Sequence, residues 1–506
     1  MRPSEKFYIT TAIAYVNAPP HLGHALEFIQ ADTIARYKRL MGNDVYFLTG
    51  TDEHGVKIFN TAKKQSKDTQ ALVDENAAHF RALKDILGLS YDDFIQTSDR
   101  KRHWPACQKL WKRLDESGDI YEKEYEGLYC EGCELFLKET ELVDGNCAIH
   151  KRPPAPLKEK NYFFRLSKYS DKIVELIESG ELKLLPETRQ AEFLNMAKEG
   201  LTDVSFSRPR EVLPWGVDVP GDESQVMYVW CDALTNYISA IGYAEETEQF
   251  RKLWPVDVHL IGKDIVRFHA GYWIGMLLSA GVELPKSILI HGFITHNGEK
   301  MSKTLGNVVD PVETAEKYGQ DALRYYLLRE IPTGRDGDFS DELFVERYNS
   351  DLANNLGNLL NRVHTLVTRN EVEDFSFDRA HEIFENKVNE TWKHYVSDMD
   401  KYDLHEAIHH VWRLVDFGNK QMEEKKPWAQ LKEDRGAGEA TLSNLLELLR
   451  HVSILISPFI PETSRKMRAQ LGLPEEIERA DEDGWGALRE WTGLGESSII
   501  FPRIES

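Results

Sequence analysis

Two histidines with a glycine between them stand near the start of the chain, in the run His21-Leu22-Gly23-His24. Two imidazoles at the beginning of a helix can both reach a phosphate, Gly23 allows a nucleotide to approach the backbone, and the helix N-terminus favours negative charge. Histidine pairs also occur by chance or as helix caps, so the element alone is a weak signal. It predicts a nucleotide contact that needs support from elsewhere in the chain.

A second candidate is Lys300-Met301-Ser302-Lys303-Thr304, in a polar, glycine-containing stretch that follows a strand-like run. Lys300 and Lys303 could close over a triphosphate and neutralise the charge that builds up as pyrophosphate leaves. Isolated lysines are more often solvated surface. However, the sequence contains neither GxxxxGK[ST] nor GxGxxG, so the two common phosphate cradles are missing and the lysine pair gains weight.

Three of the five cysteines fall in one short stretch, as CxxC followed by CxxH. Three thiolates and one imidazole form a closed tetrahedral zinc set, and a set of four protein ligands leaves no open coordination position. The pattern therefore predicts a structural zinc ion held by Cys130, Cys133, Cys147 and His150. The other two cysteines, Cys107 and Cys231, are expected to be packed thiols.

The elements that must position these residues alternate in type over the first hundred positions. Residues 7–13 are β-branched or aromatic and predict a strand, residues 21–42 have helical periodicity, residues 45–49 predict a second strand and residues 66–87 a second helix. This βαβ alternation is typical of a parallel sheet. A nucleotide would bind at the carboxyl ends of its strands.

The predicted secondary structure changes twice after the first hundred residues. Short, turn-rich pieces carrying the cysteines suggest an insertion, after which strand-like runs return at 226–230, 256–261 and 287–291. Beyond about 341 leucines and valines recur at helical spacing, with a flexible connection expected at 432–441.

We therefore predict an α/β fold: a Rossmann-like parallel-sheet catalytic domain split by a zinc-knuckle insertion and followed by an all-α helical bundle. The expected boundaries are 1–117 and 215–325 for the two halves of the catalytic domain, 118–214 for the insertion, 326–350 for a linking segment and 351–506 for the helical domain.

Composition bounds the class of protein. With 506 residues, 41% of them hydrophobic, the chain can build several cores, and nothing in it resembles a signal peptide or a membrane span. We expect a cytoplasmic protein. The net charge of −22 argues against a nucleic-acid partner, but acidic residues are spread along the chain, and a large RNA needs only a local basic or hydrogen-bonding track.

Taken together, HLGH and KMSKT resemble the HIGH and KMSKS signatures of class I aminoacyl-tRNA synthetases. Leu22 and Thr304 depart from those signatures but keep the apolar and hydroxyl character. Within that class, the surrounding segments are similar to those of the methionyl-tRNA synthetases over essentially the whole chain: ITTAIAYVNAPPHLGH, GTDEHG, DVSFSR, YVWCDALTNY and IGKDIVRFHAGYW.

The resemblance implies a methionine–tRNA ligase. Such an enzyme activates L-methionine with Mg²⁺-bound ATP to methionyl-adenylate and transfers the methionyl group to initiator and elongator tRNA(Met). His21, His24, Lys300 and Lys303 would be catalytic. Contacts to ATP are expected from these four and from Gly23, Gly262, Asp264, His291 and Gly292.

The same resemblance makes Asp52 the anchor of the methionine ammonium group. The other expected methionine-binding residues are Arg208 and a largely aromatic pocket of Ile13, Tyr15, Trp230, Ala233, Leu234, Tyr237, Ile265, His269 and Trp273. In the helical domain, the resemblance implies that Asn358, Arg362 and Trp428 read the anticodon, where splayed bases can stack on aromatic rings and bond to amide and guanidinium groups. Outside the family, most of these residues would be read as core or solvated surface.

Two rival readings are open. The chain could be a class I synthetase for another amino acid, although it looks too short for a large editing insertion, or a non-catalytic tRNA-binding relative, although it keeps both the His and the Lys motifs. No appended β-barrel domain for dimerisation is visible in the sequence, so a monomer is expected. Neither DNA nor a membrane is an expected partner.

Overall fold

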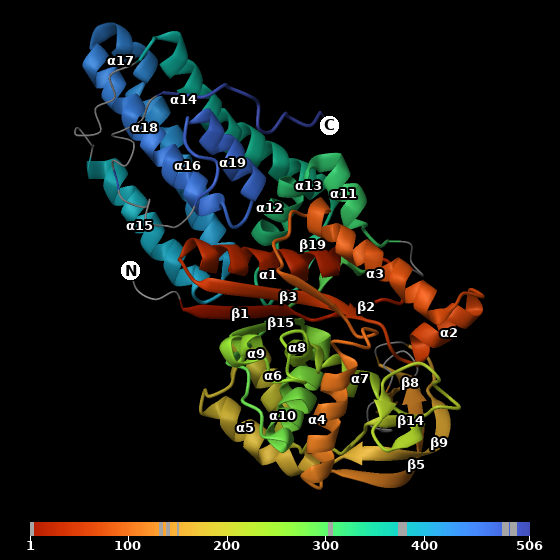
Figure 1. Ribbon diagram of the computed structural model, residues 1–506. Helices are drawn as coiled ribbons and strands as arrows, with labels where there is room; N and C mark the ends of the chain where they lie inside the picture. The colour runs from red at the N-terminus through yellow and green to blue at the C-terminus, as the bar shows by residue number, and fades with distance from the viewer. Residues whose placement is uncertain are drawn as a thin grey trace.

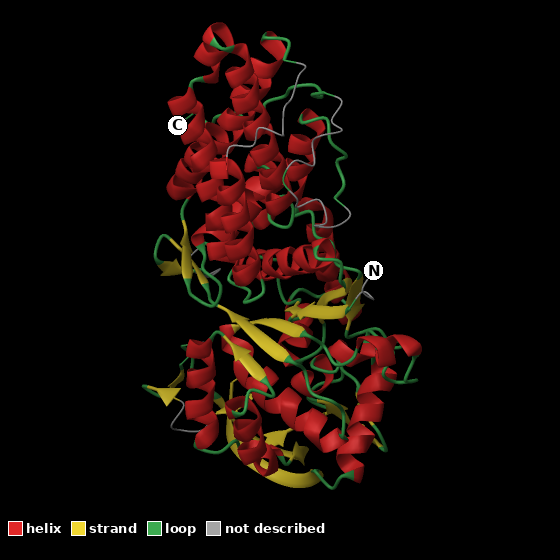
Figure 2. Cartoon of the chain, turned by 90° about the vertical axis from the view of Figure 1, so that its left-hand side faces the viewer, coloured by secondary structure: helices red, strands yellow, loops and turns green. Residues whose placement is uncertain are grey.

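The computed structural model describes residues 5–130, 135–137, 142–148, 151–301, 307–372, 382–477, 485 and 493–505, without the side chains at 125, 135, 136 and 300. The chain forms two parts, an α/β part built on a twisted sheet and a part made of packed helices (Figure 1). A view turned by 90° separates the strands of the first part from the helices of the second (Figure 2). Within the described residues, no helix is both long enough and apolar enough to cross a membrane.

The central sheet is parallel, as predicted, and has the strand order β10-β16-β15-β1-β3-β2, with β4 also paired to β3. Its strands are short and mostly buried on both faces, which suits β-branched and aromatic residues. Their bounds are β1 Lys6–Thr11, β2 Ala14–Tyr15, β3 Asp44–Asp52, β4 Asp93–Gln96, β10 Lys183–Leu185, β15 Val258–Gly262 and β16 Ser287–His291.

Helix α1 (Leu22–Leu40) lies on this sheet and most of its residues are buried. The other helices of the α/β part are α2 Val56–Lys64, α3 Thr69–Ile86, α4 Trp104–Glu116, α5 Ser170–Glu178, α6 Glu187–Lys198, α7 Val229–Ala233, α8 Asn236–Ser239, α9 Glu248–Leu253 and α10 Ile274–Ala280. Short helical segments η2 Leu166–Tyr169, η3 Lys263–Ile265 and the π-helix η4 Arg267–Trp273 complete it.

Antiparallel sheets occupy the insertion and the residues that follow it, up to Met227. The order β11-β9-β5-β6 joins Val204–Ser205, Ala155–Phe164, Ile120–Cys130 and Leu135–Leu137; β7 Leu142–Val143 pairs with β8 Asn146–Cys147; and β12 Ser207–Pro209, β14 Asp222–Met227 and β13 Asp218–Val219 form a third sheet. Two sequence expectations were wrong here. The run 226–230 belongs to this third sheet and then turns into α7, and residues 183–185, placed in the insertion, join the central sheet.

A small sheet of β17 Ile294–His296, β18 Glu299–Lys300 and β19 Gly337–Phe339 connects the α/β part to the helices. The helices are α11 Pro311–Tyr318, α12 Gln320–Glu330, α13 Asp341–Arg347, the π-helix η5 Tyr348–Gly357, α14 Asn358–Arg369, α15 Glu382–Met399, α16 Leu404–Lys425, α17 Pro427–Glu433, α18 Arg435–Ile456 and α19 Pro461–Gln470. The expected flexible connection at 432–441 was wrong, because Asp434 caps α18 and residues 435–441 form its first turns.

The two parts are joined by a buried ion pair. Arg324 on α12 and Asp32 on α1 are both fully buried, with Nη1 and Oδ2 2.8 Å apart. The same guanidinium donates to the carbonyls of Leu87, Pro458 and Phe459. Burial alone would raise the pKa of Asp32, but Arg36 and Arg324 hold it below its usual value. The helix that begins with the histidine motif is thus fixed to the helical part.

Candidate active site

The two histidines of the HLGH run cap α1. His21 accepts a hydrogen bond at Nδ1 from the Gly23 backbone N–H at 3.1 Å, and His24 accepts at Nδ1 from the His21 N–H at 3.2 Å, while their rings stack 3.9 Å apart. A Cβ on Gly23 would lie 2.9 Å from the His21 ring, so glycine makes this stack possible. Burial, together with the charges of His21 and His291, holds the pKa of His24 well below its usual value.

These caps fix the tautomers. An imidazole that accepts at Nδ1 carries its proton on Nε2, so His21 and His24 both act as Nε2–H donors next to the positive end of the helix dipole. The structure confirms that this pair lies at the N-terminus of α1, and its contact with a phosphate stays a prediction. The structure adds that His24 serves as a neutral hydrogen-bond donor and does not contribute a positive charge.

The carboxyl ends of β15 and β16 meet at a polar corner beside α1. Gly262, Asp264 and His291 are brought together there, because a Cβ on Gly262 would lie 3.0 Å from Asp264 Oδ1 and 3.6 Å from His291 Nε2. Glu27 on α1 joins them, with Oε2 3.0 Å from His291 Nε2 and Oε1 accepting from the Ala12 N–H at 2.6 Å. Sequence reasoning missed Glu27, although a carboxylate on an otherwise apolar helix face was a usable signal.

Gly292 has a different local reason to be glycine. A Cβ at this position would lie 2.0 Å from the carbonyl oxygen of Arg335, so the residue lets the segment before β19 pack against the end of β16. Its predicted contact with ATP stays a prediction.

The hairpin of β17 and β18 that leads to the lysine motif is held by Asp338, which accepts from the Gly298 N–H at 2.8 Å. The side chain of Lys300 and the residues Ser302, Lys303 and Thr304 lie outside the described structure.

Asp52 ends β3 with only 8% of its surface exposed. Its neighbour across the sheet is Tyr15, which is half-buried. Burial, followed by the negative charges of Glu27 and Asp52, raises the pKa of Tyr237. The negative charges of both acids therefore act on Tyr237.

Tyr237 and His269 form the polar end of the predicted methionine pocket. The Tyr237 hydroxyl lies 2.7 Å from His269 Nε2, and His269 Nδ1 lies 3.0 Å from the Ile265 carbonyl, an acceptor that requires Nδ1 to be the donor. Nε2 therefore accepts from the tyrosine. Burial lowers the pKa of His269 to about 4, so the pair is neutral.

Behind this pair lies a second buried histidine that the sequence did not single out. His259 on β15 accepts from Trp273 Nε1 at 3.2 Å and contacts Thr10 Oγ1 through Nδ1 at 2.8 Å, with its ring centroid 4.1 Å from that of Tyr237. Burial lowers its pKa well below the usual value. A neutral His259 thus fixes Trp273 and Tyr237 from behind.

The remaining pocket residues divide by exposure. Trp230 is partly exposed and stacks on Phe268 with centroids 3.8 Å apart and planes inclined by 4°. Ile13 and Ile265 are also partly buried, which leaves surface for a ligand. Ala233, Leu234 and Trp273 are buried and form the wall behind them. The structure thus gives this predicted group both partly exposed and fully buried members.

Arg208 lies on β12 in the insertion and is 3% exposed. It donates to Ser205 Oγ at 2.9 Å and to the Ser207 carbonyl at 2.7 Å, and it lies over the rings of Tyr129 and Tyr228. These contacts give it a structural role in the insertion. Its predicted contact with methionine stays a prediction.

Two of the four predicted zinc ligands are described. Cys130, at the end of β5, and Cys147, in β8, are both buried and share a small cluster with Leu137. Cys133 and His150 lie outside the described residues. The two buried thiols from separate strands fit a zinc site, because thiolates are the preferred ligands of structural zinc.

Arg362 and Trp428 meet on the helical part. The Arg362 guanidinium lies 5.6 Å from the centre of the Trp428 ring, and its Nη1 pairs with Glu423 at 2.7 Å. Asn358, one turn before Arg362, is exposed. The helix holding Asn358 and Arg362 and the short α17 holding Trp428 thus present these side chains on one surface, as splayed bases would require.

A parallel sheet, a histidine-capped helix after β2, a buried acid at the end of β3 and a separate helical domain are together typical of a class I aminoacyl-tRNA synthetase. The chain matches the family model described as tRNA synthetases class I (M) over residues 7–147 and 137–364, and the anticodon binding domain of methionyl tRNA ligase over residues 375–505.

Relatives of known family are similar to this chain along nearly its whole length. A methionine–tRNA ligase of Caldanaerobacter subterraneus is 44% identical over 99% of this chain and 79% of its own length, and one of Brucella suis is 42% identical over 99% and 98%. The Mycobacterium tuberculosis methionyl-tRNA synthetase in complex with methionyl-adenylate superposes with a TM-score of 0.92 at 40% identity, covering 99% of this chain and 100% of that one. The chain belongs to the methionyl-tRNA synthetases.

Proposed function

We propose that this protein is an ATP-dependent methionine–tRNA ligase that binds ATP, L-methionine and initiator and elongator tRNA(Met). The observation that carries the proposal is the neutral Tyr237–His269 pair in an aromatic pocket, because the charges of Asp52, an acid for the ammonium group, and of Glu27, in the polar corner, both act on its tyrosine. An uncharged polar end with aromatic walls suits a thioether side chain, which is apolar and polarizable.

Two displacements make up the reaction. The methionine carboxylate attacks the α-phosphorus of ATP, forming a C–O–P link as the bond to pyrophosphate breaks; a ribose hydroxyl of the terminal tRNA nucleotide then attacks the carbonyl carbon, and AMP leaves. Neither step needs a protein nucleophile. The chain contributes position and charge: Asp52 holds the ammonium group, and His21 and His24 donate Nε2–H bonds to phosphate oxygens. Mg²⁺ bound with ATP would neutralise the triphosphate.

Lys300 and Lys303 are proposed to approach the leaving pyrophosphate, and Gly23, Gly262, Asp264, His291 and Gly292 to contact ATP. The proposed methionine contacts are Asp52, Arg208 and the pocket. Zinc, held by Cys130, Cys133, Cys147 and His150, would have a structural role, since four protein ligands exclude a substrate. We place the enzyme in the cytoplasm as a monomer.

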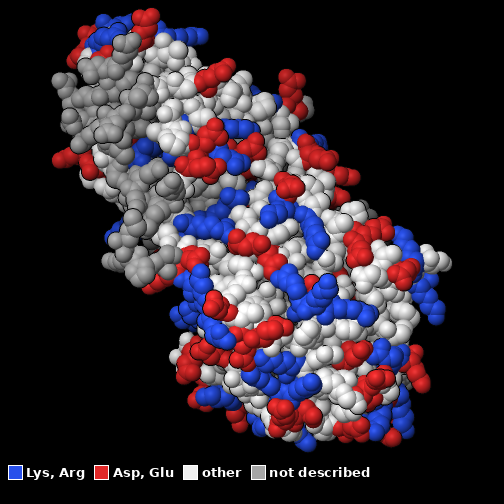
Figure 3. Space-filling model, in the orientation of Figure 1, with Lys and Arg blue, Asp and Glu red and all other residues white. Residues whose placement is uncertain are grey.

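We propose that the tRNA binds along both parts of the protein. Its anticodon would contact Asn358, Arg362 and Trp428, and its 3′ end would reach the active site. Although the chain carries a net charge of −22, lysine and arginine side chains gather across the middle of one face, over the junction of the two parts (Figure 3). A local basic surface of this kind is enough to hold phosphates along an RNA.

The test is exchange of labelled pyrophosphate into ATP, run with each of the twenty amino acids, followed by charging of tRNA(Met). Methionine alone should support exchange. Exchange with a different amino acid would keep the class and overturn the pocket, whereas no exchange with any amino acid would favour a non-catalytic relative.

A further inference from the structure

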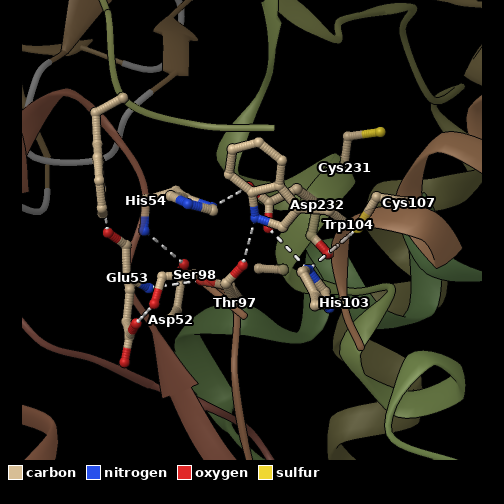
Figure 4. Close-up of polar contacts among 12 residues, drawn as sticks. Asp52, Glu53, His54, Thr97, Ser98, His103, Trp104, Cys107, Cys231 and Asp232 are labelled. Carbon is tan, nitrogen blue, oxygen red and sulfur yellow. Dashed lines mark hydrogen bonds and ion pairs between the residues drawn. The ribbon is translucent and has the colours of Figure 1, made fainter. Parts of the chain in front are cut away.

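We infer that Asp232 is a positioning residue that fixes the distance between the two halves of the amino-acid site, the ammonium anchor at Asp52 and the side-chain pocket. The inference rests on the proposed function, in which Asp52 binds the methionine ammonium group. It concerns a buried chain of hydrogen bonds, His54–Asp232–His103, that sequence reasoning did not assign to the site (Figure 4).

The first half of the site is a tightly held turn after β3. The backbone N–H of Glu53 donates to Thr97 Oγ1 at 2.8 Å, and the Glu53 carbonyl accepts from Trp215 Nε1 at 2.6 Å. The His54 N–H donates to Asp52 Oδ1 at 3.4 Å. Glu53 and His54 are at most 1% exposed. The orientation of the Asp52 carboxylate therefore depends on where the peptide of His54 lies.

The second half is carried by α7 and α8. Asp232 lies between the pocket residues Trp230 and Ala233, and Ser239 follows Tyr237 by two positions. These helices are short, and a helix of one or two turns has little stability of its own. Their placement must come from tertiary contacts.

Asp232 joins the two halves. Its carboxylate is fully buried and accepts at Oδ2 from His54 Nδ1 at 2.9 Å and at Oδ1 from His103 Nε2 at 3.1 Å. His103, on the turn before α4, contacts Ser239 Oγ through Nδ1 at 2.8 Å. Figure 4 shows the carboxylate between the two rings.

The electrostatics agree with this role. Burial alone would raise the pKa of Asp232, but the two histidines outweigh it and hold the pKa below its usual value, so the group is a carboxylate. A buried carboxylate with two donors on opposite sides is rigid, because moving either ring leaves an unsatisfied buried charge. One side chain thereby sets the separation of the Asp52 turn from α7.

The geometry supplies matched variants, because asparagine places its amide nitrogen near the Nδ1 position of histidine and glutamine near the Nε2 position. At residue 54 the bond to Asp232 uses Nδ1, so His54→Asn should keep it and His54→Gln should lose it. At residue 103 the bond uses Nε2, so His103→Gln should keep it and His103→Asn should lose it. A role limited to filling space would show no such reversal.

The experiment is methionine-dependent pyrophosphate exchange, with kcat normalised to active sites counted by the adenylate burst. His54→Gln and His103→Asn should each raise the KM for methionine about tenfold, as expected for a lost hydrogen bond to a charged group. His54→Asn and His103→Gln should stay within about threefold of the parent. The KM for ATP should be nearly constant throughout. Asp232→Asn, which keeps the side-chain shape, should also raise the KM for methionine and serves if a histidine variant does not fold.

Asp119→Asn is the control, because Asp119 is an equally buried carboxylate that bonds to Lys168 and Ser279 away from the pocket. It should leave both KM values unchanged. Equal effects of Asn and Gln at both positions, or a parallel rise in the KM for ATP, would overturn the inference while leaving the proposed function intact. A parent enzyme with no methionine-dependent exchange would instead overturn the proposed function.

Discussion

The pair of Glu27 and His291 at the ATP corner should behave as a buried ion pair whose strength falls as the pH rises. Burial raises the pKa of Glu27, and the hydrogen bond from His291 only partly offsets this. Burial alone would lower the pKa of His291, but the hydrogen bond to Glu27 and its charge outweigh burial and raise it. Both groups therefore hold protons more tightly in the folded state than in the unfolded chain.

The direction in which the free energy of unfolding changes with pH follows from the linkage between proton binding and folding. A histidine with a raised folded pKa contributes its stability fully below its unfolded value of about 6.5 and loses it as the pH rises through the folded pKa. The raised pKa of Glu27 also makes stability fall as the pH rises through it. The charged pair thus exists above the folded pKa of Glu27 and below that of His291, and it weakens as the pH is raised from a lower value, near the ordinary histidine pKa of about 6.5, to a higher, alkaline one.

The perturbation is a double-mutant cycle of Glu27→Gln and His291→Asn. The side chains are only 12% and 7% exposed, so solvent screens little of their interaction. A hydrogen bond between charged groups contributes about 1.5–3 kcal/mol and a neutral one about 0.5–1.5 kcal/mol. We therefore expect a coupling free energy of about 1–2 kcal/mol at the lower pH, and a smaller one at the higher pH.

Urea unfolding of the four proteins at both pH values measures this coupling. His291→Asn keeps a group near Nδ1 for the Gly292 carbonyl, which His291 contacts at 2.8 Å, so the cycle isolates the Nε2 bond. A coupling that grows with pH, or that is absent at both values, would refute the ion-pair interpretation.

Three further outcomes are expected. Arg362→Ala should lower kcat/KM for tRNA by a factor that corresponds to about 1–3 kcal/mol, the range for loss of one arginine contact to a base, and should leave pyrophosphate exchange unchanged; equal losses in both assays would contradict an anticodon role. Cys147→Ser should abolish zinc binding, measured by elemental analysis of the purified protein, and unchanged zinc content would exclude the knuckle. Arg324→Met should cost about 3–5 kcal/mol in urea unfolding because it leaves the buried Asp32 unpaired, and a loss below about 1 kcal/mol would contradict that.

The sequence predicted the parallel sheet because its strands and helices carry their own periodicity. The run 287–291 coincides with β16, and the helical pattern from 21 to 42 gives α1 almost to its ends. The predictions were wrong where the structure of a segment depends on distant residues and not on its local sequence pattern. Residues 226–230 have strand propensity, but which sheet a strand joins is set by distant partners, and here the partner is β12. Residues 435–441 contain two glycines but form a helix because α18 packs along its whole length.

The same distinction holds within the site. Residues that occur in recognisable runs, such as His21, His24 and Asp52, could be named from the sequence, and their positions at a helix start and a strand end agree with the structure. Glu27 and His259 could not be assigned in this way. Each has one partner more than two hundred positions away in the chain, His291 for Glu27 and Thr10 for His259, and a local pattern does not show that such partners meet.

Asp232 gives the clearest physical reason for this limit. It belongs to a segment that the family resemblance already quoted, yet its own neighbours in sequence, Trp230 and Ala233, explain only the pocket. Its two partners come from the end of β3 and from the turn before α4, so its role exists only after three separate segments have packed. A buried carboxylate bonded to two imidazoles favours the arrangement of those segments that keeps both bonds, because other arrangements leave a buried charge without one of its donors. The precision of the amino-acid site therefore comes from a residue that need not touch the amino acid.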